Sequence, residues 1–106
     1  MSNSSTATGL DLIEPVHPGE ILLVDFIQGF DLSQNRVAVA LGVPPRRINE
    51  IVLGKRGITA DTAIRLARYF GTSEEFWMNL QADYELRMQH RALEGKLEAI
   101  PPLQGA

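Results

Sequence analysis

The stretch SQNRVAVALGVPPRRINEIVLGK, residues 33–55, decides the fold of this chain. Its apolar residues recur at helical spacing in two short runs, so each run can bury one face of a helix. Gly42 separates the runs and can adopt the left-handed backbone of a tight turn. The stretch therefore predicts two short helices joined by a turn, with the apolar residues Val37, Leu41, Val43, Ile48 and Ile51.

Small and cyclic residues at defined positions favour a close crossing of these two helices. Ala38 has a short side chain where the second helix must pass. Ser33 is placed to cap the first helix, and Pro44-Pro45 suits the start of the second, where a backbone N–H is not required. These positions predict a helix-turn-helix unit over residues 33–55, although an ordinary helical hairpin would give the same pattern.

The segment before this unit predicts one further helix. Pro18 suits a first helical turn and Glu20 suits its positive end, so a helix is expected from there to about Phe30. His17 and Glu20 are predicted to cap this helix, because two residues do not make a metal site.

Two more helices are predicted after the unit. The first begins at Thr59 and ends at Gly71, where a glycine stops the helical pattern. The second opens with a capping box formed by Thr72 and Glu75 and continues to about Ala92. Since strand-like alternation is absent from the sequence, we predict an all-α fold with about five helices.

Composition divides the chain into one ordered domain and two tails. Residues 1–14 are rich in Ser and Thr and lack periodicity, which predicts a flexible N-terminal tail. The ordered domain is expected over residues 15–92, and residues 93–106 are expected to be loosely ordered. With 106 residues and 44% hydrophobic composition, the domain is small and would gain stability from a partner chain.

The compartment is inferred from what the sequence lacks. Its N-terminus has no basic start followed by an apolar run, and no stretch is long and apolar enough to span a membrane. The chain has no cysteine, which excludes disulfides and thiolate metal sites and fits a reducing compartment. We therefore expect a cytoplasmic protein with no cofactor, no metal and no membrane partner.

The net charge of −3 conceals a basic segment in the middle of the chain. Residues 31–70 contain seven of the ten basic residues against three acids, which gives this segment a charge of +4. Charge concentrated in this way is typical of a surface that binds nucleic acid. Asp61 precedes Arg65 by four residues, so a salt bridge on a solvated helix face is expected there instead.

The second helix of the unit carries side chains that can read base edges. Winding it at about 100° per residue places Arg46 and Glu50 opposite Ile48 and Ile51, with Asn49 at the edge. Arginine pairs with guanine, asparagine with adenine and glutamate with cytosine, so these three polar residues are predicted base contacts. Alternatively, Arg46 and Glu50 form only a surface ion pair, since they are four residues apart.

Phosphate contacts are predicted on either side of this helix. Gln34 and Asn35 lie at the start of the preceding helix, where exposed N–H groups and amide side chains suit a phosphate oxygen. Arg47, Lys55 and Arg56 supply positive charge within and just after the second helix. We predict that these five residues hold the DNA backbone.

One helix-turn-helix unit reads only a few base pairs, so a two-fold dimer on a palindromic site is expected. The last long helix is the candidate interface, because Phe76, Trp77, Leu80 and Tyr84 supply a large aromatic and apolar area. Packing of Trp77 in the core of one protomer is the alternative.

Three further blocks flank or follow the two-helix unit: HPGEIL at 17–22, GKRGITADTAIRLARYFGTS at 54–73 and EFWMNLQADYEL at 75–86. With these blocks the chain resembles the HigA-type antitoxins, a branch of the XRE/Cro-like repressors that includes virulence-associated protein I. The resemblance implies a five-helix, lambda-repressor-like domain and a homodimer that represses its own operon. It also implies a paired RelE/HigB-like toxin, which cleaves mRNA on the ribosome and is neutralised by the bound antitoxin.

The DNA-contacting positions of this family can be carried over residue by residue. Pro45 departs from the polar residue that is usual in the wider repressor family, so it is expected to contribute shape rather than hydrogen bonds. No motif marks the toxin contacts. The positions are Gln34, Asn35, Pro45, Arg46, Asn49, Glu50, Lys55 and Arg56.

Other classes of function fit the sequence less well. The only histidines are His17 and His90, and nothing assembles a nucleophile, a base and an orienting group, so an enzyme is not expected. A stand-alone XRE-type regulator without a toxin shares every DNA-binding residue and is the main alternative. A pure protein-interaction module, in which the two-helix unit is only a scaffold, is the third.

Overall fold

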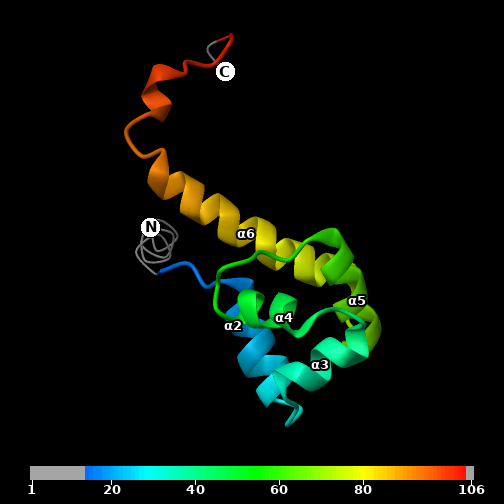
Figure 1. Ribbon diagram of the computed structural model, residues 1–106. Coiled ribbons are helices and arrows are strands. Elements are labelled where there is room, and N and C mark those ends of the chain that lie inside the picture. Colours follow the sequence, from blue (N-terminus) through cyan, green and yellow to red (C-terminus); the bar gives the residue numbers. More distant parts are fainter. Residues whose placement is uncertain (1–13, 105–106) are drawn as a thin grey trace, which may run out of the picture. The chain divides into compact units, whose positions relative to one another are not determined.

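A computed structural model describes residues 14–104, which form helices and turns without a strand (Figure 1). The first two helical segments follow each other without a break, so the prediction of an all-α fold with about five helices is confirmed. The prediction of a flexible tail over residues 1–14 lies outside the described residues, apart from Glu14. The elements are α2 (Pro18–Ile21), η1 (Leu22–Gln28), α3 (Gln34–Leu41), α4 (Pro45–Val52), α5 (Ala60–Phe70), α6 (Glu74–Ala92) and η2 (Leu97–Ala99).

The chain divides into two compact units. The first, Val16–Tyr84, contains the predicted helix-turn-helix unit and all of the predicted site residues. In the second, whose described residues are 14–15 and 85–104, Arg91 Nη1 lies 3.1 Å from Glu14 Oε2. The candidate site can therefore be described within the first unit alone.

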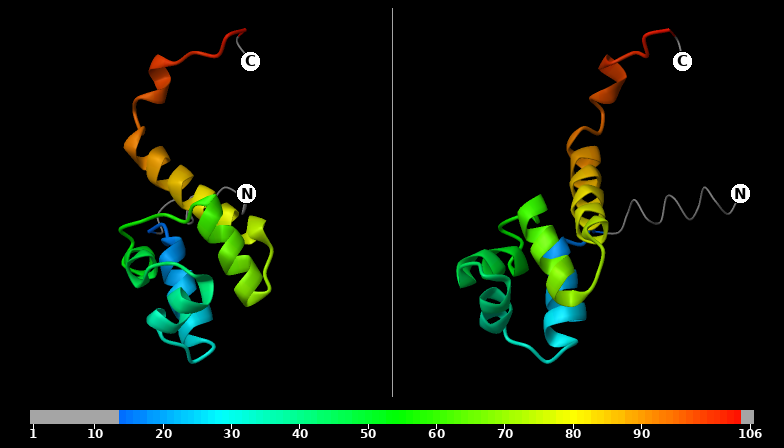
Figure 2. Two further views of the ribbon diagram at one scale, coloured as in Figure 1. Left: turned by 45° about the vertical axis from the view of Figure 1, so that its right-hand side comes forward. Right: turned by 90° about the vertical axis from the view of Figure 1, so that its right-hand side faces the viewer.

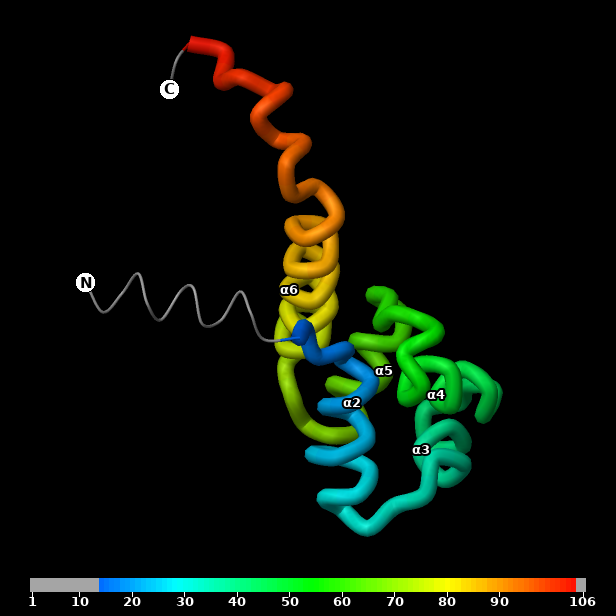
Figure 3. Tube along the Cα trace, turned by 90° about the vertical axis from the view of Figure 1, so that its left-hand side faces the viewer, coloured from blue at the N-terminus to red at the C-terminus, as the bar shows by residue number. Residues whose placement is uncertain are grey.

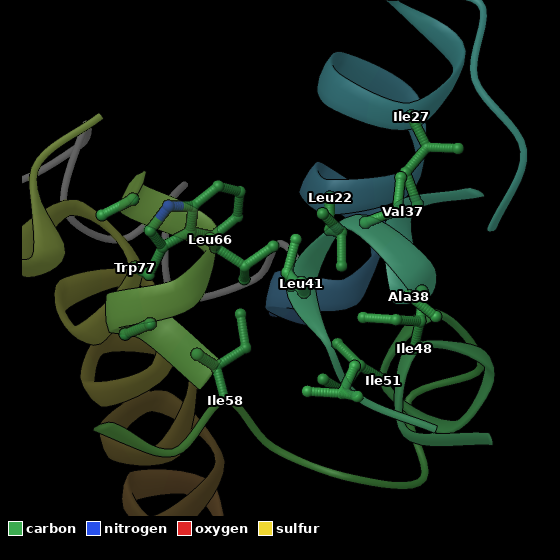
Figure 4. Packing of buried hydrophobic residues seen from close by; sticks show 13 residues of the cluster. Leu22, Ile27, Val37, Ala38, Leu41, Ile48, Ile51, Ile58, Leu66 and Trp77 are labelled. Carbon is green, nitrogen blue, oxygen red and sulfur yellow. The ribbon is translucent and has the colours of Figure 1, made fainter. Parts of the chain in front are cut away.

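One hydrophobic core holds the first unit together. Figure 4 shows buried side chains from η1, α3, α4, α5 and α6 gathered in the same interior. Figures 2 and 3 show α3 and α4 next to each other on the same side of the first helix. Each fully buried large side chain stabilises the fold by about 1.5–3 kcal/mol. Since α3 and α4 both contribute side chains to this core, the core holds the two helices together. The largest fully buried hydrophobic residues are Trp77, Leu22, Ile27, Ile48, Ile51, Leu66 and Val37.

The first helix differs from the predicted regular α-helix. It begins as predicted at Pro18, where the Nδ1 atom of His17 accepts a hydrogen bond of 2.9 Å from the backbone N–H of Gly19. From Leu22 it becomes a π-helix, η1, whose bonds join residues five apart. This wider turn places Leu22 and Ile27, five residues apart, in the core together. Burial of both side chains accounts for a change that helical periodicity alone did not predict.

The cap of α6 is also different from the prediction. Ser73 and not Thr72 caps the helix, since its Oγ atom accepts a hydrogen bond of 3.0 Å from the N–H of Phe76. The Oγ1 atom of Thr72 instead accepts the indole N–H of Trp77 at 2.7 Å. The predicted Thr72–Glu75 capping box is therefore wrong, because a buried indole N–H needs an acceptor and Thr72 provides it.

Candidate nucleic-acid interface

Helix α4 has one buried and one exposed face, as its sequence predicts. Pro44 precedes the helix in an extended conformation and Pro45 occupies its first turn, where proline costs no hydrogen bond. Ile48 and Ile51 are completely buried, whereas the Arg46 side chain is 84% exposed. The predicted reading face is thus open to a ligand in the protomer.

The start of α3 is joined to the exposed face of α4 by side-chain amides. Ser33 caps α3 as predicted, since its Oγ atom accepts the N–H of Arg36 at 3.0 Å. The Nδ2 atom of Asn49 donates a hydrogen bond of 2.6 Å to the Oε1 atom of Gln34. Gln34 and Asn49 were predicted separately, as a phosphate contact and a base contact. The structure brings them together, so the first turn of α3 and the reading face of α4 form one continuous polar surface.

Glu50 lies between two arginines on this surface. Its Oε2 atom accepts from Arg46 Nε at 2.8 Å, and its Oε1 atom accepts from Arg56 Nε at 2.9 Å. The hydrogen bonds from Arg46 and Arg56 hold the pKa of the Glu50 carboxyl below its ordinary value, so Glu50 stays ionised at neutral pH. The surface ion pair that was the alternative role of Arg46 and Glu50 is therefore present in the free protein, with Arg56 as its third member.

Asp61 forms a second carboxylate bridge, which connects α4 to α5. Its Oδ1 atom accepts from Arg65 Nε at 2.7 Å and from Arg47 Nη1 at 2.9 Å. Arg65 Nη1 also donates to the carbonyl oxygen of Leu41 at 2.7 Å, at the end of α3. The hydrogen bond from Arg65, followed by that from Arg47, lowers the pKa of Asp61.

The expected Asp61–Arg65 salt bridge is confirmed by this geometry. Arg47, which was predicted to contact phosphate, is bonded to Asp61 and has a side chain only 28% exposed. The sequence did not indicate this pair, because Arg47 and Asp61 are 14 residues apart.

The basic loop after α4 is anchored from α6. Gly54 ends the helical segment with a left-handed φ of 76°, and Lys55 and Arg56 follow it on the exposed surface. The buried side chain of Gln81 accepts the N–H of Ile58 at 2.8 Å through its Oε1 atom. Gln81 was missed in the sequence, although it lies four residues after Trp77 and therefore on the same face of the helix.

Helix α4 is also fixed by close contact with the start of α2. A Cβ atom added to Gly19 would lie 1.8 Å from the carbonyl oxygen of Ile51, so no larger residue fits there without movement. The block HPGE therefore has a structural role: its histidine caps α2 and its glycine lets α2 meet the end of α4.

The four residues of the predicted dimer surface differ in exposure. Trp77 has no exposed surface and packs in the core, which was the alternative for this residue. Phe76 is 37% exposed, Leu80 is half-buried, and Tyr84 is half-buried with its ring 4.8 Å from the His17 ring. A dimer surface here stays a prediction, for Phe76, Leu80 and Tyr84.

Residues 14–104 contain neither a membrane-spanning helix nor a cluster of metal ligands. None of the helices in this range is long and apolar enough to cross a membrane. In the same range, no three His, Cys, Asp or Glu side chains are grouped so that they could hold a metal ion.

Comparisons with known proteins agree with this geometry. A family profile described as helix-turn-helix matches residues 27–77. Virulence-associated protein I of Dichelobacter nodosus is 49% identical over 84 residues, which is 79% of this chain and 78% of the relative. The HTH-type transcriptional regulator YbaQ of Escherichia coli is 37% identical over 73 residues, which is 69% of this chain and 65% of the relative.

A solved structure extends the comparison to three dimensions. The antitoxin HigA of Pseudomonas aeruginosa, solved with the higBA promoter, is 50% identical to this chain. It superposes with a TM-score of 0.81, over 84% of this chain and 98% of the solved chain.

Proposed function

Because the chain belongs to the HigA-type branch of the helix-turn-helix proteins, we propose that it is a DNA-binding antitoxin that represses its own operon. The observation that carries the proposal is the exposed polar face of α4, held above two completely buried isoleucines. A rigid helix with arginine, asparagine and glutamate on its outer side is what the major groove accommodates. That a relative 50% identical to this chain was solved with a promoter supports the same proposal.

In the proposed complex, α4 lies in the major groove and its neighbours contact the backbone. Arg46 pairs with guanine and Asn49 with adenine, after Asn49 exchanges its bond to Gln34 for a bond to the base. Gln34 and Asn35 then face a phosphate at the start of α3, and Lys55 holds another from the loop after α4.

The remaining predicted contacts have smaller or different roles. Pro45 sets the shape of the first turn of α4 and donates no hydrogen bond. Arg56 reaches phosphate while it remains beside Glu50. Arg47 contributes less than Lys55, because binding a phosphate would cost its bond to Asp61.

We propose that the protein acts as a homodimer on a palindromic operator. One α4 helix contacts a few base pairs, and a two-fold pair doubles that number and fixes the spacing of the half-sites at about one helical turn. The partly exposed Phe76 and the half-buried Leu80 and Tyr84 are the proposed contacts between the protomers.

The proposed protein partner is a RelE/HigB-like toxin that cleaves mRNA. The support is that the solved relative is described as an antitoxin. No motif of this chain marks a toxin contact. Coexpression with the adjacent reading frame, followed by affinity purification of this chain, tests the proposal. A small basic protein that copurifies and inhibits growth when expressed alone is expected.

DNA binding is tested by a gel-shift experiment with the region upstream of the gene, repeated at increasing salt. We expect a shift that survives an excess of random duplex and weakens as salt rises, because phosphate contacts release counterions. Equal affinity for the upstream region and for random duplexes would contradict sequence-specific repression.

A stand-alone regulator without a toxin is the second candidate. The observation that favours it is the 37% identity to a relative described as a transcriptional regulator. Specific binding in the gel shift without any copurifying toxin would select this candidate over the antitoxin.

A further inference from the structure

Glu50 is less exposed than the two arginines that it bonds. Its side chain is 24% exposed, compared with 84% for Arg46 and 45% for Arg56. A duplex approaching the outer face of α4 therefore meets the arginines before the carboxylate. Both carboxylate oxygens already accept hydrogen bonds, Oε2 from Arg46 and Oε1 from Arg56.

The atoms used in these bonds leave the arginines able to bind DNA. Glu50 holds Arg46 through Nε, at 2.8 Å, so the two terminal amino groups of Arg46 remain as a fork. Such a fork is the group that pairs with the O6 and N7 atoms of guanine. Arg56 is held through Nε and Nη2, which leaves Nη1 for a phosphate oxygen.

We infer that Glu50 is a positioning residue, which aims Arg46 at a base and Arg56 at the backbone instead of contacting a base itself. This inference rests on the proposed function, because it assigns a role within DNA reading. It replaces the cytosine contact predicted for Glu50 from the sequence.

The same arrangement limits binding to random DNA. The cluster of Arg46, Glu50 and Arg56 has a net charge of +1, whereas two free arginines would present +2 to the phosphates. Electrostatic attraction to phosphates is independent of sequence, so the carboxylate lowers non-specific affinity while it orders the reading fork. Glu50 therefore raises the ratio of specific to random binding in two ways.

Asp61 offers a matched control within the same domain. It too is a carboxylate that accepts hydrogen bonds from two arginines, Arg47 and Arg65, but it connects α4 to α5 and lies outside the reading face. Asp61→Ala therefore removes the same charge and the same kind of bridge as Glu50→Ala.

In the experiment, each protein binds a pool of random duplexes and the bound sequences are identified. The proteins are the wild type, Glu50→Ala, Glu50→Gln, Arg46→Ala and Asp61→Ala. We expect Glu50→Ala to relax the same base pair as Arg46→Ala and to lower the ratio of specific to random binding about fivefold or more. The affinity of Glu50→Ala for random duplex should rise, with a salt slope steeper by about one. Glu50→Gln keeps one acceptor oxygen, so its ratio of specific to random binding should lie between those of Glu50→Ala and the wild type. Asp61→Ala should keep the wild-type base preference.

Two outcomes separate the inference from the proposed function. If the wild type selects no sequence, the proposed function fails and the role of Glu50 fails with it. If the wild type selects a sequence but Glu50→Ala relaxes a different base pair from Arg46→Ala, Glu50 contacts a base directly and only the inference is overturned.

Discussion

The two faces of α4 differ in their exposure and in the partners of their side chains. Ile48 and Ile51 are completely buried, whereas Arg46 is 84% exposed and bonded to Glu50. Changes on the inner face should alter the free energy of unfolding and leave the proposed DNA contact unchanged, whereas changes on the outer face should alter the proposed DNA contact and have little effect on stability. Since the side chains of the two faces contact different partners, their effects should be separable by mutation.

The largest effect is expected from breaking the inner face. Ile48→Ala removes a completely buried side chain and leaves a cavity, so the free energy of unfolding should fall by about 2–5 kcal/mol. Urea unfolding measures this change. The fraction that remains folded at low temperature should keep the wild-type base preference, and an altered preference would show that the faces are coupled.

The next largest effect is expected at Gly19, where α2 contacts the end of α4. In Gly19→Ala the new Cβ atom would lie 1.8 Å from the carbonyl oxygen of Ile51, so α2 and α4 must separate. Overpacking of this kind costs about 1–3 kcal/mol, measured by urea unfolding. Gln28→Ala, at an exposed position of η1, serves as the control and should change stability far less. Equal stability of Gly19→Ala and the wild type would show that the contact between α2 and α4 relaxes freely.

On the outer face, Arg46→Ala should act on recognition and leave the fold intact. The loss of one arginine–guanine pair should reduce discrimination at one base pair in each half-site by about 1–3 kcal/mol. Thermal unfolding should be nearly unchanged, since the side chain is 84% exposed and its ion pair is on the surface. Lys96→Ala removes the same charge from the other unit and controls for net charge. Equal losses on operator and random duplex would remove the assignment of Arg46 as a base contact.

A smaller effect is expected at the edge of the outer face. Lys55→Ala should weaken binding to all duplexes alike and flatten the dependence of log K on log salt by about 0.9, because one phosphate contact is lost. Titrations at several salt concentrations measure the slope. A change in preferred sequence would instead place Lys55 among the base contacts.

The smallest effect is a pH dependence at the cap of α2. Burial lowers the pKa of His17 below 6.5, so the folded state binds fewer protons at this site than the unfolded state does. Stability should therefore fall as the pH decreases through 6.5 towards the lower pKa of the folded state. His17→Asn keeps a capping side chain but does not titrate, so its unfolding free energy should depend less on pH over this range. Urea unfolding of both proteins at pH 7.5 and 5.5 measures this difference. If both proteins lose the same stability between these pH values, His17 is not the source of the pH dependence.

Local sequence was enough to predict most of the helices. Ser33 and Pro45 begin α3 and α4 as predicted, and Gly42 forms the turn between them with a φ of 73°. These features depend on residues within one or two turns of each other, through caps, fixed backbone angles and apolar spacing. The π-helix η1 was not predicted, because it depends on packing against other elements. The true cap of α6 was not predicted, because Thr72 is taken by the indole N–H of Trp77, whose ring is buried in the core.

The sequence by itself determined that α4 would be amphipathic and basic, since the order of its residues fixes which side chains share a face. Only the tertiary structure decided their partners: Asn49 with Gln34, Arg47 with Asp61, and Ile58 with Gln81. These pairs are 15, 14 and 23 residues apart, so helical spacing carries no information about them. Their geometry arises because a shared hydrophobic core brings separate helices to within the length of a hydrogen bond.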